Sequence, residues 1–248
     1  MRNLHIIMPM AGEGSRFRNK GIETPKPLIK ANGVPFFIRA LYGIKDKFDI
    51  SNLKITCIVQ KKHVDDYHID EEILKYIKAN IIVLSKPTNG AVQSCLAAQP
   101  CINENEAILI LDCDLEWHCN KYVSTIEHLL SSSTNDVGGM LLSFNSDDKR
   151  YSYAEVKDGL VVRTAEKNVI SNNALVGAYY FNTSYDFINA AQDLIEHNKL
   201  SDINEYYVSL LYNYLIKGNR AVKIFEVDSL YSFGTPEELE HYEQLNVY

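Results

Sequence analysis

The stretch LHIIMPMAGEGSRF, residues 4–17, joins an apolar run of strand length to a loop that contains Gly12 and Gly14. Glycine takes positive φ without strain and lets a ligand approach the main chain, so successive backbone N–H groups can converge on an anion. Basic side chains crowd residues 16–30, where Glu23 is the single acid: Arg16, Arg18, Lys20, Lys26 and Lys30. A loop of this kind behind a buried strand predicts a site for a nucleoside triphosphate.

Two common phosphate-binding loops do not fit this stretch. The dinucleotide-binding loop requires a third glycine where this chain has Phe17, and an acid at the end of the second strand, where it has Gln60. A Walker-type loop requires Gly-Lys-Ser/Thr after four spacer residues, and no such run occurs in the sequence. The loop therefore belongs to a different type.

Apolar runs of strand length alternate with helical periodicity in the first part of the chain, and Asn120 is expected to cap a helix. The runs cover residues 4–8, 53–59, 80–84, 107–111 and 137–143. Such alternation predicts parallel strands joined by right-handed crossovers, with ligands at the carboxyl ends of the strands. The loops that would meet there are residues 9–20, 86–94 and 112–118.

The pattern changes after about residue 144. Short strands are expected at 153–156, 160–165 and 178–181, and Asp158-Gly159 is a strong hairpin signal. We expect an antiparallel addition here, followed by helices near 184–198 and 203–217. Tyr207, Leu210, Leu211 and Tyr214 share helical spacing, which favours a place in the core.

Composition limits the function classes. The 248 residues are 46% hydrophobic and 23% charged, as in ordinary globular proteins, and the net charge of −7 argues against unspecific binding to nucleic acid or anionic membranes. Five cysteines without a Cys-x-x-Cys pair indicate a reducing compartment. With no secretory signal pattern at the N-terminus, we expect a cytoplasmic protein.

Five ordered motifs resemble those of the nucleotidyltransferases that make nucleotide-activated sugars and related phospho-compounds. They are MPMAGEGSRF (8–17) with PKPL (25–28), TNGAVQS (88–94), DCD (112–114), AEK (165–167) with SNNALVG (171–177), and FGTPEEL (233–239). Each motif is weak alone, but their order covers nearly the whole chain. The most similar type is the short bacterial enzyme of capsule and surface-polysaccharide synthesis.

The resemblance implies a fold and a reaction. The fold is a Rossmann-like three-layer α/β/α fold with a mostly parallel central sheet and a small antiparallel addition. It forms one domain, 1–248, in which residues 1–144 bind the nucleotide and residues 145–248 bind the acceptor.

The reaction that the resemblance implies joins the NMP of an NTP to a phosphorylated small acceptor, a sugar phosphate or another phospho-compound, and releases pyrophosphate. The short chain resembles cytidylyltransferases, so CTP is favoured. Neither nucleic acid nor membrane is an expected partner, and a homo-oligomer stays open.

Lys26 and Arg16 are the expected catalytic cations. Both reactants are polyanions, so catalysis depends on positioning and on cations that stabilise charge. Lys26 lies between Pro25 and Pro27, which stiffen the main chain. The fork of the Arg16 guanidinium suits the β- and γ-phosphates.

Asp112 and Asp114 are the expected Mg²⁺ ligands. They follow an apolar strand at positions i and i+2, so both carboxylates can face one ion. The resemblance places the metal aspartate at Asp114. Many relatives carry a second aspartate where this chain has Ser232, and Asp228 is the substitute we expect, although Asp228 could instead cap a turn.

The resemblance also assigns two sets of binding residues. The expected nucleotide-binding residues are Met10, Ala11, Gly12, Glu13, Gly14, Ser15, Arg16, Lys26, Asn89, Gly90, Ala91, Gln93 and Asp112. The expected acceptor-binding residues are Glu166, Lys167, Asn172, Asn173 and Gly177, with Lys167 facing the acceptor's phosphate.

Two other functions compete with this interpretation. A metal-dependent glycosyltransferase would also use Asp112-x-Asp114 to hold a diphosphate, but it has no need of the loop from Ala11 to Lys30. A non-catalytic regulatory protein with this fold would have no physical use for Arg16, Lys26 and Asp114 together. Release of pyrophosphate from a triphosphate would distinguish a nucleotidyltransferase from both alternatives.

Overall fold

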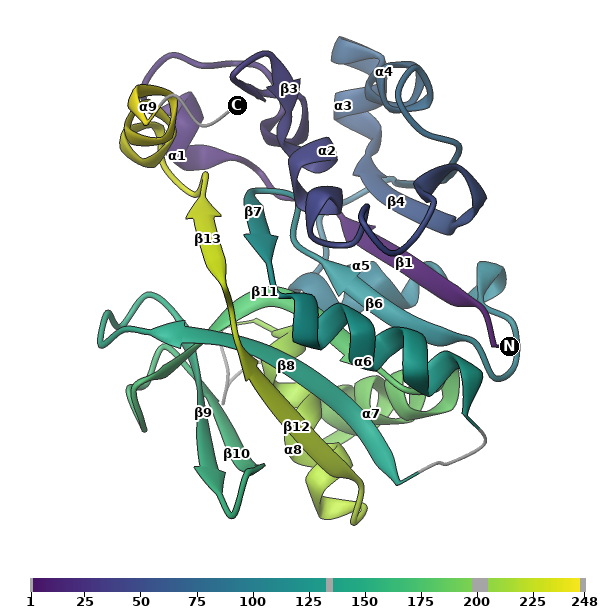
Figure 1. The fold of residues 1–248 in the computed structure, drawn as a ribbon. Coiled ribbons are helices and arrows are strands. Elements are labelled where there is room, and N and C mark those ends of the chain that lie inside the picture. Colours follow the sequence, from purple (N-terminus) through teal and green to yellow (C-terminus); the bar gives the residue numbers. More distant parts are fainter. Residues whose placement is uncertain (1, 133–135, 198–204, 246–248) are drawn as a thin grey trace.

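In the computed structural model, which describes residues 2–132, 136–197 and 205–245, one nine-stranded sheet runs through the described chain (Figure 1). The strands lie in the order β5-β4-β1-β6-β11-β8-β12-β10-β9. Their bounds are β1 Leu4–Pro9, β4 Lys54–Gln60, β5 Asn80–Leu84, β6 Ala107–Leu111, β8 Val137–Asn145, β9 Ser152–Lys157, β10 Leu160–Glu166, β11 Asn173–Phe181 and β12 Ala221–Glu226. Two short ribbons, β2 Lys30–Ala31 with β3 Val34–Pro35 and β7 Leu115–His118 with β13 Ser229–Ser232, stand beside the sheet.

The sheet is parallel in its first half and mixed in its second. Strands β5, β4, β1 and β6 are mutually parallel, as the alternating sequence pattern predicts. Beyond β6 the pairings are antiparallel, except that β12 runs parallel to β8. The expectation of a mostly parallel sheet therefore holds for the first half only. Strands β9 and β10 are joined through Asp158 and Gly159, both at positive φ, and so tight a turn joins only antiparallel strands.

Helices cover both faces of the sheet, which makes the three-layer α/β/α fold that the sequence predicts (Figure 1). Because side chains alternate along a strand, Ile6 and Met8 enter one core and Ile7 the other. Burial on both faces explains why these strands read as continuous apolar runs. Three helices contribute to the first core: α2 Phe36–Ala40, α4 Ile69–Leu74 and α6 Asn120–Ser131. Helix α3 Lys61–Tyr67 precedes α4. The second core includes α5 Ala91–Leu96, α7 Ser184–His197 and α8 Leu211–Lys217.

A third apolar cluster joins the two ends of the chain. Phe17 from α1 Ser15–Arg18 packs with Phe36, Phe233 and Tyr242, the last from α9 Pro236–Gln244. The rings of Phe36 and Phe233 stack with their centroids 4.8 Å apart. This cluster holds the C-terminal motif beside the glycine-rich loop, as Figure 1 shows for α1 and α9.

Two helix boundaries differ from the sequence expectation. Helix α6 begins at Asn120, but its N-cap is Cys119, which offers no side-chain cap. Helix α8 begins at Leu211 after a 3-10 turn at Val208–Leu210, and the expected start at 203 lies outside the described residues. Tyr207 therefore precedes the helix and is only half-buried, so the prediction that it lies in the core was wrong. No helix in the described ranges is both long and apolar enough to cross a membrane.

Candidate active site

Two hollows meet at the carboxyl ends of β1 and β6, and Asp112 and Asp114 line both. The first hollow, of about 450 Å³, opens over the glycine-rich loop; its wall also includes Gly12, Gly14, Arg16, Lys26 and Gly234. The second hollow, of about 230 Å³, is walled by β9, β10 and β11; its wall also includes Arg150, Ser152, Glu166, Tyr179 and Tyr207. The two carboxylates stand where the contents of one hollow would meet those of the other.

Gln60, at the end of β4, anchors the glycine-rich loop through two hydrogen bonds. Its Nε2 donates to the Ala11 carbonyl at 2.5 Å and to Glu13 Oε1 at 3.2 Å. Glu13 also pairs with Arg18 at 2.6 Å, and the hydrogen bond from Gln60, with the help of Arg18, lowers the pKa of Glu13. Gly14 adopts φ +62° before α1, a conformation that favours glycine.

The expected nucleotide-binding residues of this loop therefore divide into two groups. Ala11 and Glu13 serve as attachment points for Gln60 and Arg18. The others line the first hollow: Met10, Gly12, Gly14, Ser15 and Arg16. The structure thus separates residues that shape the loop from residues that face the first hollow.

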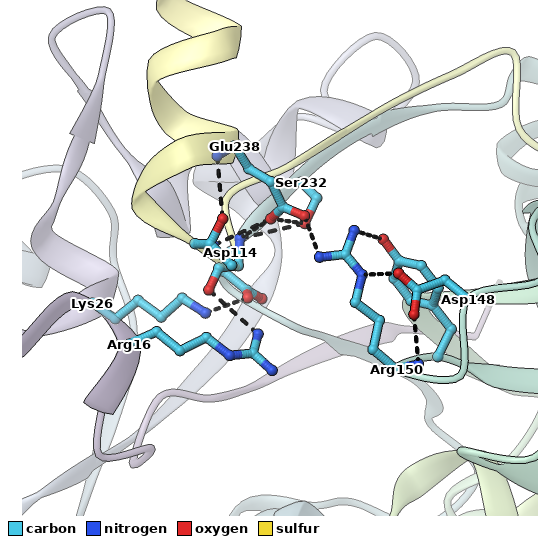
Figure 2. A network of polar contacts seen from close by, with 10 residues as sticks. Arg16, Lys26, Asp114, Asp148, Arg150, Ser232 and Glu238 are labelled. Carbon is cyan, nitrogen blue, oxygen red and sulfur yellow. Dashed lines mark hydrogen bonds and ion pairs between the residues drawn. The ribbon is translucent and has the colours of Figure 1, made fainter. Parts of the chain in front are cut away.

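Lys26 and Asp114 form an ion pair at the floor of the first hollow, with Nζ 2.5 Å from Oδ2 (Figure 2). Lys26 starts a 3-10 turn, Lys26–Leu28, between the two prolines. Burial disfavours the charged form of both groups, but the opposite charge of the partner has the larger effect. The pKa of Lys26 is therefore raised and the pKa of Asp114 is lowered. Arg16 approaches the same group from α1, with a long 3.5 Å contact from Nη1 to the Gly234 carbonyl.

Asp112 sits directly over Gly177 of β11. Its N–H donates to the Gly177 carbonyl at 2.8 Å, and a Cβ on Gly177 would lie 2.2 Å from Asp112 Oδ2. Burial, together with the charge of Asp114, raises the pKa of Asp112 to about 7. Gly177, expected to contact the acceptor, lines the second hollow and also leaves room for this carboxylate.

The donor set at this junction fits a magnesium ion. Two carboxylates face both hollows, and burial together with the charge of Asp114 raises the pKa of Asp112, so a cation between the two carboxylates would stabilise its charged form. Within the described residues no third histidine, cysteine or acid completes a three-ligand cluster around them. Mg²⁺ commonly uses one or two carboxylates together with substrate phosphates and water.

Asp228, the expected second metal ligand, is used elsewhere. Its Oδ2 accepts a hydrogen bond from the Asn120 N–H at 3.0 Å, so it caps helix α6 where Cys119 cannot. The β13–β7 register pairs Ser229 with His118 and brings Ser232, rather than Asp228, beside Leu115 and Asp114. The assignment of Asp228 to the metal is therefore corrected to a helix cap.

The second expected nucleotide loop folds around Gly90, which has φ +118°. A Cβ there would lie 2.6 Å from the Tyr206 N, because the chain at Tyr206 crosses the loop and bonds to Asn89 and Val92. Gln93 Oε1 accepts from the Asn89 N–H at 2.9 Å, so this side chain partly closes its own loop. Of the four expected residues, Ala91 lines the second hollow.

Glu166 forms the deep polar wall of the second hollow. It accepts hydrogen bonds from the hydroxyls of Ser152 and Ser209, and burial still raises its pKa. Lys167, at φ +52°, is exposed and donates from Nζ to the Tyr207 hydroxyl at 2.8 Å, which raises its pKa. The structure therefore places Lys167 behind Tyr207 rather than in the hollow wall.

Asn172 and Asn173 do not reach the second hollow. The Asn172 carbonyl accepts from the Ser146 and Ala174 N–H groups, and Asn173 Nδ2 donates to the Ala154 carbonyl at 3.2 Å. These contacts join the ends of β8, β9 and β11. The expected acceptor contact is corrected to a structural role, because neither residue lines the hollow, the Asn173 amide bonds to a backbone carbonyl, and Asn172 holds the strand ends through its main-chain carbonyl.

Sequence reasoning missed three residues at the site: Gln60, Arg150 and Glu238. Glu238 Oε2 accepts from Ser232 Oγ, the Gly234 N–H and the Thr235 N–H, and Thr235 Oγ1 accepts from the Glu238 N–H (Figure 2). This is a capping box, and the Thr-x-x-Glu spacing was the signal that could have found it. Arg150 lies in a charged loop that gave no comparable signal.

The glycine-rich loop behind β1, the lysine paired with a strand-end carboxylate and the two adjoining hollows make up the candidate active site. The family model for nucleotidyl transferase matches residues 5–229, so the chain belongs to this family. The search of curated proteins finds no significant match.

Several solved structures share this fold. One is a nucleoside-diphosphate-sugar pyrophosphorylase from Vibrio cholerae RC9, with TM-score 0.80, 22% identity, and coverage of 96% of this chain and 99% of that one. Another, from Bacillus anthracis, is described as a glucose-1-phosphate thymidylyltransferase in complex with a sucrose; its TM-score is 0.78 at 19% identity, over 99% and 96%. A third is the inositol-1-phosphate CTP transferase from T. maritima, with TM-score 0.73 and 12% identity over 100% and 99%. Identities this low show the fold alone.

Proposed function

We propose that this protein transfers the NMP of an NTP, with CTP favoured, to a small phosphorylated acceptor and releases pyrophosphate. The observation that carries this proposal is the meeting of two hollows at Asp112 and Asp114, with Lys26 on one side of the junction. The first hollow takes the triphosphate and the second takes the acceptor. Such a junction would bring the acceptor's phosphate next to the α-phosphate, and positioning two reactants in this way supplies a large part of the rate enhancement.

The reaction exchanges one P–O bond for another. An oxygen of the acceptor's phosphate attacks the α-phosphorus in line, and the bond from that phosphorus to the bridging oxygen of the β-phosphate breaks. Its electron pair leaves with pyrophosphate. Lys26 stabilises the negative charge on the α-phosphate, while Arg16 and the loop N–H groups hold the β- and γ-phosphates. Mg²⁺ held by Asp114 and Asp112 would neutralise phosphate charge when bound.

Several finer assignments belong to the same proposal. Residues 1–144 supply most of the first hollow and residues 145–248 most of the second, although Glu205 and Gly234 also line the first. The preference for CTP rests on the resemblance to cytidylyltransferases, and the acceptor is a sugar phosphate or another small phospho-compound. A role in capsule or surface-polysaccharide synthesis in the cytoplasm, with Mg²⁺ as cofactor, completes the proposal.

Pyrophosphate release tests this function directly. Each common triphosphate is paired with sugar 1-phosphates and small phosphorylated amines or amino acids, with Mg²⁺ present, and pyrophosphate is measured with a coupled assay. We expect release with at least one pair, and greater release with CTP than with UTP, TTP or GTP. Failure of every pair would sink the enzymatic proposal, and consumption of a nucleotide-sugar would favour a glycosyltransferase.

A further inference from the structure

The wall of the second hollow carries little positive charge for a hollow proposed to bind a phosphorylated acceptor. Among its described wall residues Arg150 is the one cation, against three carboxylates: Asp112, Asp114 and Glu166. A phosphate brought into this wall would meet repulsion unless a cation is aimed at it. Lys167 does not lie in the wall, because its ammonium group is bonded to the Tyr207 hydroxyl.

We propose that Arg150 is the residue that binds the acceptor's phosphate, and that Glu238 holds its guanidinium in place until the acceptor arrives. Arg150 Nη1 lies 2.7 Å from Glu238 Oε1 and Nε lies 3.0 Å from Asp148 Oδ2, so two carboxylates occupy the fork that would grip an anion (Figure 2). Arginine forks match phosphate and carboxylate alike, so an acceptor phosphate can replace Glu238. This inference rests on the proposed function.

The position of Arg150 is built by its own loop. The Arg150 N–H donates to Asp148 Oδ1 at 3.0 Å, and the Tyr153 hydroxyl donates to the Asp148 carbonyl at 2.7 Å. The guanidinium lies over the Tyr151 ring, 4.7 Å from its centroid, and Nη2 donates to the Tyr151 hydroxyl at 2.5 Å. Tyr151 also lines the second hollow, so the ring keeps the guanidinium beside the cavity while its fork changes partner.

Glu238 can release Arg150 without losing its own place. All three donors of the turn, Ser232 Oγ and the N–H groups of Gly234 and Thr235, go to Oε2, whereas Arg150 bonds to Oε1. The capping box of α9 therefore survives when the guanidinium leaves. With 40% of the Arg150 side chain and 20% of the Glu238 side chain exposed, the exchange needs no opening of the core.

Two substitutions with opposite expected effects test this. Arg150→Met removes the fork and should weaken phosphate binding at least about tenfold, the usual scale for a charge-assisted pair. Glu238→Gln keeps an oxygen for the turn but presents a neutral amide to the guanidinium, which frees Arg150 and should tighten phosphate binding about threefold. Arg163→Met is the matched control, because Arg163 pairs with Glu155 on the exposed side of the hairpin.

The probe is inorganic phosphate, titrated calorimetrically with saturating pyrophosphate present to fill the first hollow. Arg150→Met and Glu238→Gln must shift the Kd in opposite directions; equal shifts in one direction would mean that the pair only ties the loop to α9. A wild type that binds no phosphate, or an Arg150→Met variant that binds it normally, would overturn the proposal. These titrations need no turnover, so failure of the pyrophosphate assay remains a separate result. With a reacting pair, Arg150→Met should raise the KM of the acceptor and leave that of the triphosphate unchanged.

Discussion

Lys26 and Asp114 form an ion pair at the floor of the first hollow, and each stabilises the charged form of the other. The raised pKa of Lys26 and the lowered pKa of Asp114 mean that the pair stays ionised over the whole physiological range. In the proposed reaction, a lysine held in this way would meet the α-phosphate already charged, without first having to take up a proton. The prolines on either side fix the stem from which it reaches.

Replacing Lys26 should remove most of the catalysis. We expect Lys26→Ala to lower kcat by about 10²–10³-fold, the scale for losing one donor that stabilises the transition state. Lys30→Ala is the control, because Lys30 is an exposed residue at the start of β2. Initial rates of pyrophosphate release measure both variants. A Lys26→Ala protein with the wild-type rate would show that another group carries this charge.

Gly177 tests whether Asp112 must stay in place. Because an added Cβ would overlap Asp112 Oδ2, Gly177→Ala should displace the carboxylate, reduce the rate about 100-fold, and cost about 1–3 kcal/mol of stability. In Gly218→Ala the new Cβ meets its nearest atoms at 3.4 Å, so that variant should keep its rate. Unfolding in urea and initial rates give the two readouts. Full activity in Gly177→Ala would show that Asp112 is dispensable.

At the scale of elements, the β7–β13 ribbon organises the junction. Pairing Ser232 with Leu115 brings the turn before α9 next to Asp114, and the Phe233 N–H donates to the Asp114 carbonyl at 2.7 Å. The same register carries Asp228 to the start of α6. One short ribbon thus sets both the C-terminal wall of the site and the cap of a helix.

Asp228 should therefore matter for stability and not for chemistry. Asp228→Ala is expected to lower the free energy of unfolding by about 1 kcal/mol, as for loss of a helix cap, and to leave kcat unchanged. Asp228→Asn, which keeps an oxygen to accept from the Asn120 N–H, should lose less. Asp114→Asn is the comparison that should abolish turnover. If Asp228→Ala instead lost turnover at unchanged stability, the metal role would be restored.

At the scale of the whole molecule, a buried polar group lies at the opposite end of β1 from the site. His5 is fully buried, and its ring nitrogens lie 3.2 Å from Glu106 Oε2 and 2.8 Å from Thr56 Oγ1. Burial, with the charge of Lys54, lowers the pKa of His5 from 6.5 to about 4. Lys54 also pairs with Glu106 at 2.9 Å, so the histidine has little to gain from a proton.

Stability should consequently fall in mild acid. The unfolded chain protonates His5 near pH 6.5 and the folded chain only near pH 4, so stability is complete above pH 6.5 and declines as the pH drops between these values. We expect a loss of about 2 kcal/mol between pH 7.5 and pH 5. Urea unfolding at the two pH values measures it. In His5→Gln the decline should be smaller by most of that amount, and an equal decline in both proteins would exclude His5 as the cause.

Local pattern predicted the strands of the first half, the α6 helix, the Asp158-Gly159 hairpin and the position of Lys26 behind the glycine-rich loop. These depend on hydrophobic period and turn chemistry, which a few neighbouring residues determine. Asp228 and Asn173 were assigned to the site because their side chains suit its ligands. Their actual partners are backbone groups on other elements, and no local spacing encodes such a partner.

The sequence by itself determined that this chain builds an α/β nucleotidyltransferase with a glycine-rich loop, a flanking lysine and a strand-end pair of aspartates, since each of these is a contiguous motif. Only the tertiary structure decided which polar groups meet. Arg150 and Glu238, or Asp228 and Asn120, come together through strand register and the packing of α9 against α1. Register is fixed by burial over the whole sheet, and therefore by residues far from those that it brings into contact.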